Sequence, residues 1–218
     1  MLTNLFSSFD PSTKSLLQMN WISMITALII LPKKFWVKSS RMTLIKKIFK
    51  NKMLEEMSNI TKNQQIKMIM VSTFMFIIIN NIMGLTPYTF TATSHLVVSL
   101  SLSLPMWLML MIYGWTKSTN LMFAHLVPSG TPAILMPFMI LIETISNFIR
   151  PISLSVRLMA NMIAGHLLMT LLGNINSIKI MPLIMIIQMI LLTFEMAISM
   201  IQAYVFTILG TLYSSEIP

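Results

Sequence analysis

From Met68 to Thr116 the sequence contains no charged residue. As one α-helix this stretch would be ~74 Å long at 1.5 Å per residue, whereas the hydrocarbon core of a bilayer is only ~30 Å thick. The chain must therefore fold back on itself, and Gly84–Pro87 supplies the residue types of a turn. We predict two antiparallel transmembrane helices, over residues 68–86 and 96–115.

The composition of the whole chain also indicates a membrane protein. Of its 218 residues, 56% are hydrophobic and only 10% are charged, and the mean hydropathy is +0.79. Soluble globular proteins carry roughly 25% charged residues, so a water-soluble enzyme is excluded. The high apolar content also excludes disorder. Because the chain has no cysteine, it has no disulfide framework and no thiolate metal site.

Ten of the fifteen basic residues lie between residues 33 and 67. Apolar residues recur there at helical spacing, namely Ile45, Phe49, Met53, Met57 and Ile60. This pattern predicts an amphipathic helix over 40–62 that lies on the membrane surface, with a solvated loop helix as the alternative. The positive-inside rule puts this segment on the cytoplasmic or matrix side. A first span over 15–32 precedes it, so the N-terminus is expected outside.

Two long apolar segments form the last third of the chain, at residues 133–173 and 180–213. A helix over the second would be ~51 Å long and would need a tilt of ~50° to stay inside the core, against a usual ~20°. We favour two strongly tilted helices over broken re-entrant ones, because residues 188–210 lack proline. The expected fold is an all-α integral membrane protein. Residues 1–218 would form a single membrane domain of about five to six helices, ending in this hairpin.

Three ionisable residues lie deep within these two segments, namely Glu143, Arg157 and Glu195, and His166 joins them. Ionisable groups inside a membrane are energetically expensive and usually functional. Arginine does not deprotonate in proteins, so Arg157 can attract or hold an anion but cannot carry a proton. The alternative is a structural ion pair between Arg157 and either Glu143 or Glu195.

The helical wheel separates Arg157 from His166, which lie ~180° apart at 100° per residue. The residues within about 60° of Arg157 are mostly small, namely Ser153, Ala160, Asn161, Ala164 and Leu168. Small residues let a second helix approach closely. The face around Arg157 therefore suits a partner helix that carries a carboxylate.

Polar residues form a stripe along one side of the last helix: Gln188, Glu195, Ser199 and Gln202. Such a stripe can hydrate a proton path, or it can join helices through hydrogen bonds. Glu195 favours the proton path, because a carboxyl group can accept and release a proton. Histidine titrates near neutrality, although a lone His166 is more often a packing residue. Glu143, nearer the inside end, would serve the other side of the membrane.

Several stretches of this sequence carry a resemblance to a known family. They are SVRLMANMIAGHLL (155–168), IETIS (142–146), EMAISMIQAYVF (195–206), AHLVPSGTP (124–132) and NNIMGLTPYTFT (80–91). These stretches closely resemble the subunit a family of rotary F-type ATP synthases, in its mitochondrial form. The resemblance covers the chain from about residue 68 to 213 and extends to residues 1–67 in pattern only.

The resemblance implies a stator subunit beside a rotating ring of c subunits. Two offset half-channels would couple proton flow to ring rotation and ATP synthesis. Arg157 matches the arginine that faces the ring carboxylates, and His166 and Glu195 match the pair lining the half-channel from the intermembrane space. Asn161 and Gln202 match polar partners near the arginine, and Ser153 belongs to the same expected set. Glu143 matches the carboxylate of the matrix-side exit.

The resemblance also implies a location and partners. The chain would be a multi-pass, non-catalytic subunit in the mitochondrial inner membrane, with its N-terminus facing the intermembrane space. Expected partners are the c ring, the peripheral-stalk subunit b, small membrane subunits and lipid. No nucleic acid, metal or cofactor is expected, and the three histidines lie in separate segments.

Two other functions remain open on the sequence alone. A self-contained secondary transporter or channel would need a substrate site within this chain, often with broken helices or an internal repeat, and no repeat is evident. A structural subunit would pair its charges internally. Replacing Glu143 or Glu195 by glutamine separates these functions, because a structural role predicts lost assembly and a proton role predicts altered flux.

Overall fold

The computed structural model describes residues 5–12, 18–30, 38–61, 63–86, 89–127, 132–174 and 181–215. In these ranges the regular secondary structure is entirely helical, which confirms the predicted all-α fold. Four of the helices, α3, α4, α6 and α7, are long and apolar enough to cross a membrane. The α-helices are α1 (Ser23–Ile30), α2 (Arg41–Ile60), α3 (Gln64–Gly84), α4 (Leu96–Lys117), α5 (Thr119–His125), α6 (Met136–Gly173) and α7 (Met181–Ser215). Short 3-10 helices are η1 (Leu5–Phe9), η2 (Met19–Ile22), η3 (Ala92–Ser94) and η4 (Ala133–Leu135).

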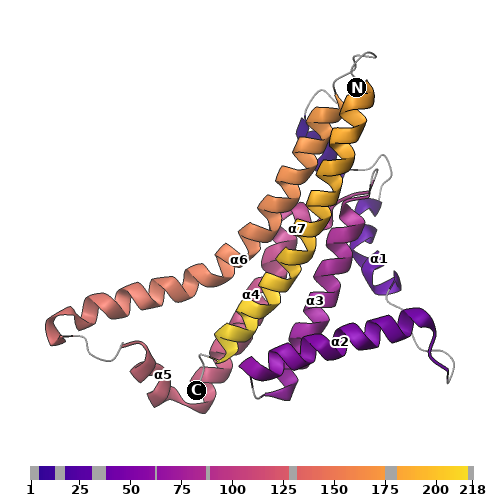
Figure 1. The fold of residues 1–218 in the computed structure, drawn as a ribbon. Helices are drawn as coiled ribbons and strands as arrows, with labels where there is room; N and C mark the ends of the chain where they lie inside the picture. The colour runs from indigo at the N-terminus through magenta and orange to yellow at the C-terminus, as the bar shows by residue number, and fades with distance from the viewer. Residues whose placement is uncertain are drawn as a thin grey trace.

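The bundle is organised around α7, which packs along α3 and α6 and also contacts α4, while α4 packs along α6 (Figure 1). The apolar core lies between them and includes Met70, Phe74 and Ile77 of α3, with Leu158 of α6 and Phe206 of α7. Burial of these side chains fixes the helices against one another, which sets the geometry of the space between α6 and α7.

A row of small residues on α7 makes the contact with α3 close. Ser199, Ala203, Thr207 and Thr211 are buried and recur at every fourth position, the spacing of one helix face. The hydroxyl groups of Ser199, Thr207 and Thr211 donate to carbonyl oxygens of α7 itself at 2.8–3.3 Å. Small side chains let helix backbones approach. Here the buried hydroxyls also keep hydrogen-bond partners.

The two long helices are continuous, as expected for tilted rather than broken segments. α6 has 38 residues and α7 has 35. Pro151 lies inside α6 and has no N–H to donate to the preceding turn. Figure 1 shows the N-terminal half of α6 leaving the bundle, while its C-terminal half lies along α7. The short link predicted between them falls mostly outside the described residues.

α2 departs in part from the predicted surface helix. Its N-cap is Ser40, whose side chain accepts a hydrogen bond from the Thr43 N–H. Met53 and Met57 are buried inside the protein, and Phe49 stacks on Phe74 of α3 with ring centroids 5.5 Å apart. Only the N-terminal half of the predicted apolar stripe stays exposed, because the C-terminal half packs against α3.

Other boundaries also differ from the sequence prediction. The described part of the expected first span consists of η2 and α1, and its ends fall outside the described residues. α3 begins at Gln64, four residues before the predicted start. The short helix α5 was not predicted. It is followed by η4, which leads into α6.

α6 and α7 present much apolar surface outward. Only 11% of the most apolar window of α7 is buried within the chain, against 39% for α3. A water-exposed surface of this kind is unusual for a soluble monomer. It is the surface expected of helices that face lipid or neighbouring membrane helices.

Candidate functional site

Two cavities adjoin the space between α6 and α7. The smaller, of about 140 Å³, is mostly apolar, and its polar lining residues are Asn81, Asn161, Glu195, Ser199 and Gln202. Asn161 comes from α6, and Glu195, Ser199 and Gln202 come from the predicted polar stripe of α7. The structure thus brings together three residues that sequence analysis had assigned to the site, namely Asn161, Glu195 and Gln202.

The larger cavity, of about 740 Å³, is here called the vestibule. Its lining includes His166 and Thr170 of α6, Gln188 and Glu195 of α7, and Asp10 and Asn20 from the N-terminal region. The link between α3 and α4 adds Thr86, Thr89 and Thr91. Hydroxyl, amide and ionisable groups give this cavity a lining that can hold water, which needs several polar partners.

Glu195 lines both cavities. Its side chain is only 9% exposed, and its Oε1 atom has no hydrogen-bond partner in the described part of the chain. A buried polar atom without a partner is costly and calls for an explanation. The position between a polar cavity and an apolar one suits a carboxyl group that takes up a proton on one side and releases it on the other.

Gly165 of α6 makes room for this carboxyl group. A Cβ atom at Gly165 would lie 2.9–3.1 Å from the carboxyl carbon and both oxygens of Glu195. Real Cβ atoms tolerate no such contact without movement of the neighbour, so Glu195 can rest against α6 only because residue 165 is glycine. Sequence analysis did not single out Gly165. Its position directly before His166 was the only available signal.

His166 lies at the inner wall of the vestibule. Its ring meets the edge of the Phe9 ring from η1, with centroids 6.1 Å apart and planes at 86°. The His166 Nε2 atom is buried and makes no hydrogen bond to any described residue. The residue as a whole lines the vestibule, and an imidazole can exchange a proton near neutrality.

Arg157 stands apart from both cavities, on an exposed part of α6. Within the described residues its guanidinium forms no ion pair and no side-chain hydrogen bond. The predicted alternative of an ion pair with Glu143 or Glu195 is therefore not observed. Ser153, on the same side of α6, is also exposed, and its hydroxyl donates to the Arg150 carbonyl at 2.9 Å.

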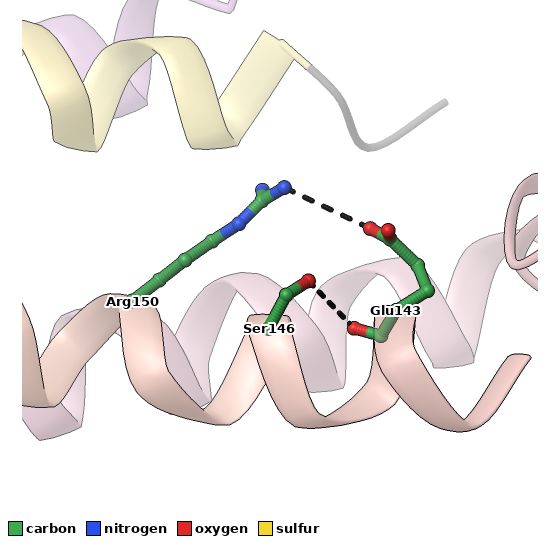
Figure 2. Close-up of polar contacts among 3 residues, drawn as sticks. All are labelled: Glu143, Ser146 and Arg150. Atoms are coloured by element: carbon green, nitrogen blue, oxygen red, sulfur yellow. Dashed lines mark hydrogen bonds and ion pairs between the residues drawn. The ribbon is translucent and has the colours of Figure 1, made fainter. Parts of the chain in front are cut away.

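Glu143 lies in the other half of α6 and is paired with Arg150 (Figure 2). One guanidinium nitrogen of Arg150 is 3.7 Å from the Glu143 Oε1 atom. The Arg150 guanidinium also lies over the Tyr213 ring of α7, with Cζ 4.9 Å from the ring centroid. Figure 2 also shows the Ser146 hydroxyl donating to the Glu143 carbonyl, at 2.9 Å. Sequence analysis had not assigned a role to Arg150.

No group of three histidine, aspartate or glutamate residues that could hold a metal is found among the residues that the structure describes. The ionisable groups between α6 and α7 are instead a histidine and a carboxylate beside a cavity, with a separate arginine on an outer face. The fold and this arrangement define a multi-pass membrane protein with ionisable residues beside the cavities between two long helices.

Comparison with known proteins places the chain in a family. The family model for the ATP synthase A chain matches residues 16–215. The chain is 52% identical to ATP synthase subunit a of Locusta migratoria, and 50% identical to the subunits a of Drosophila yakuba and Aedes aegypti, each time over the full length of both chains. The chain belongs to the ATP synthase A chain family. It is a proton-translocating subunit of the membrane sector and not a catalytic subunit.

Proposed function

We propose that this chain forms two offset half-channels, which carry protons to and from the carboxylates of a c-subunit ring. Arg157 is the fixed cation between the half-channels, so that proton flow turns the ring and drives ATP synthesis. The subunit works in the mitochondrial inner membrane, beside the peripheral-stalk subunit b and small membrane subunits. Its N-terminus faces the intermembrane space.

The observation that carries this proposal is the position of Glu195 between the two cavities. Protons enter the vestibule, pass His166 and reach Glu195. From there they continue through the small cavity lined by Asn161 and Gln202. Asn161 lies one helical turn beyond Arg157 on α6, so this route ends beside the arginine.

Arg157 suits the meeting point with the ring because its charge is permanent. A ring carboxylate that arrives beside it is favoured in the ionised form, since an opposite charge within a few ångströms stabilises the charged state. A proton cannot pass along the arginine itself, so the two half-channels stay separate. The exposed, unpaired guanidinium supports this role, because an internal partner would compete with the ring.

The exit half-channel on the matrix side uses Glu143. This carboxylate lies in the opposite half of α6 from His166 and is only half-buried. Its partner Arg150 orients it beside α7 through the Tyr213 ring. The ion pair at 3.7 Å is loose, and the carboxylate can therefore accept a proton from the ring and pass it to water.

The orientation of the chain follows from its charges. α2, with five of the fifteen basic residues, and the C-terminal end of α7 lie at one end of the bundle in Figure 1, while η1 and the C-terminal end of α6 lie at the other. Basic segments favour the matrix side. The vestibule, bounded by η1, then opens toward the intermembrane space.

The test is proton pumping by inner-membrane vesicles whose ATP synthase carries Arg157→Ala, with assembly of the complex checked on a native gel. We expect an assembled complex in which ATP-driven pumping is abolished and passive proton leak does not fall. The matched control is Ile152→Ala, since Ile152 is also exposed on α6 but lies about 140° away on the wheel.

Pumping by the control should stay close to the unmodified level. If an assembled Arg157→Ala complex still pumped protons, the arginine would be a structural residue and the proposed mechanism would be wrong. A complex that failed to assemble in both variants would instead indicate that the exposed residues of α6 are needed for packing, which also contradicts the proposal.

A further inference from the structure

The N-terminal segment forms a wall of the vestibule. η1 packs against α6, and Phe9 meets the His166 ring edge-on. The next three residues make a turn, in which the Ser12 N–H donates to the Asp10 Oδ1 atom at 3.2 Å. The Asn20 side chain donates to the Pro11 carbonyl at 3.4 Å and ties this turn to η2. These contacts hold Asp10 at the vestibule.

Asp10 is the exposed ionisable group of this cavity. The other ionisable side chains among its lining residues are His166 of α6, which is half-buried, and Glu195 of α7, which is buried. Elements η1, η2 and the α3–α4 link contribute only uncharged polar and apolar residues besides Asp10. The three groups thus line one cavity, and their burial increases from Asp10 through His166 to Glu195.

We infer that Asp10 is a proton-collecting residue at the mouth of the vestibule, and that it feeds the route through His166 and Glu195. This inference rests on the proposed function and adds the group that receives protons from the outer solution. The proton binds a carboxylate oxygen of Asp10 and is released to water in the vestibule, with no other bond made or broken.

A proton-collecting group at the mouth matters when the arrival of protons from the outer solution limits the rate. At ~10¹⁰ M⁻¹ s⁻¹, the upper end of the diffusion limit, one site in an unbuffered solution near pH 7 receives on the order of 10³ protons per second. Typical enzyme turnover is about 1–10³ per second, so direct capture by a recessed imidazole can limit the rate. A carboxylate at the mouth adds a capture site and attracts cations by its charge.

The test separates this charge from the turn that Asp10 makes. Asp10→Asn removes the charge but keeps a side chain that forms the same turn, whereas Asp10→Ala removes both. ATP synthesis is measured in mitochondria that carry each variant, at low buffer concentration and alkaline outer pH. We expect both variants to slow synthesis about two- to fivefold, with native assembly, and acidic outer pH or concentrated mobile buffer to restore the rate.

A normal rate for Asp10→Asn with a reduced rate for Asp10→Ala would show that Asp10 only shapes the turn, which would overturn the inference. Normal rates for both variants would overturn it as well. A deficit that neither buffer nor acid relieves would also contradict proton collection. Arg157→Ala, measured in parallel, keeps the two proposals apart. If it abolishes coupled transport while Asp10→Asn is normal, only the inference about Asp10 fails.

Discussion

The two halves of α6 each carry an arginine, and the two side chains differ in their contacts and exposure. Arg150, beside Pro151, is paired with Glu143 and lies over the Tyr213 ring. Arg157, two turns further on, is exposed and forms no ion pair within the described residues. The same residue type on the same helix is therefore held by contacts within the chain in one half and exposed in the other. Residue type alone does not distinguish these roles.

The largest effect should separate the two arginines directly. Arg157→Lys should lower ATP-driven proton pumping at least tenfold, because a lysine ammonium is a compact charge that loses its proton when desolvated, unlike a guanidinium. Arg150→Lys should keep most of the activity, since a lysine can still pair with Glu143. Vesicle pumping measures both, and equal activity of the two variants would remove the distinction.

The next largest difference is expected between two carboxylates, Glu195 of α7 and Glu143 of α6. Glu195→Gln should slow proton flux about tenfold or more, because a buried proton carrier is lost. Glu143→Gln should slow it only about threefold, since water can partly replace a half-exposed carboxylate. Both complexes should assemble. Flux is measured in vesicles of equal complex content, and loss of assembly in either variant would favour a structural role for that residue.

A smaller effect on proton flux is expected from filling the space that Gly165 leaves for the Glu195 carboxyl group. Gly165→Ala should lower flux about fivefold, because the new Cβ displaces the carboxyl group that it would meet at 2.9–3.1 Å. Alanine is the better helix former by about 1 kcal/mol, so the loss should not come from unfolding of α6. Gly173→Ala is the matched control, since its Cβ would lie 3.6 Å from the Gln188 amide nitrogen, an ordinary contact. Equal flux in both variants would contradict the assigned position of Glu195.

The smallest effect on pumping is expected from changes at Tyr213, whose ring contacts the Arg150 guanidinium. Tyr213→Leu removes a cation–π contact worth about 0.5–1 kcal/mol at an exposed site. We expect pumping to stay within about twofold and the complex to dissociate at a slightly lower temperature on a native gel. Tyr213→Phe keeps the ring and should behave as the unmodified protein. A large loss of pumping in both variants would show that the hydroxyl, not the ring, matters.

Much of the fold was predictable because hydrophobic runs longer than a bilayer is thick leave few arrangements. Uncharged stretches predicted the helices α3 and α4, and the absence of proline between residues 188 and 210 predicted a continuous α7. The wheel placed His166 and Arg157 on opposite faces, and the structure has His166 at the vestibule and Arg157 on an outer surface. These features depend on local periodicity, which a single sequence contains.

The missed features depend on contacts between segments far apart in the chain. Sequence analysis assigned no role to Asp10, and nothing in its neighbourhood indicated that Phe9 of η1 would pack against His166. The clearance at Gly165 appears only when α7 is placed against α6. The contact of Arg150 with Tyr213 likewise joins α6 to the far end of α7. The C-terminal half of the apolar stripe on α2 was assigned to the membrane surface because its protein partner, α3, could not be identified.

The contact between α3 and α7 can form only after the last helix of the chain has been synthesised. α3 is made early, but it packs along the last helix of the chain. Until α7 is made, the buried Asn81 amide lacks the Ser199 carbonyl to which it donates at 3.5 Å. A polar group inside lipid without a partner is unfavourable. Nascent chains that stop before α7 therefore hold an incomplete interface in the membrane.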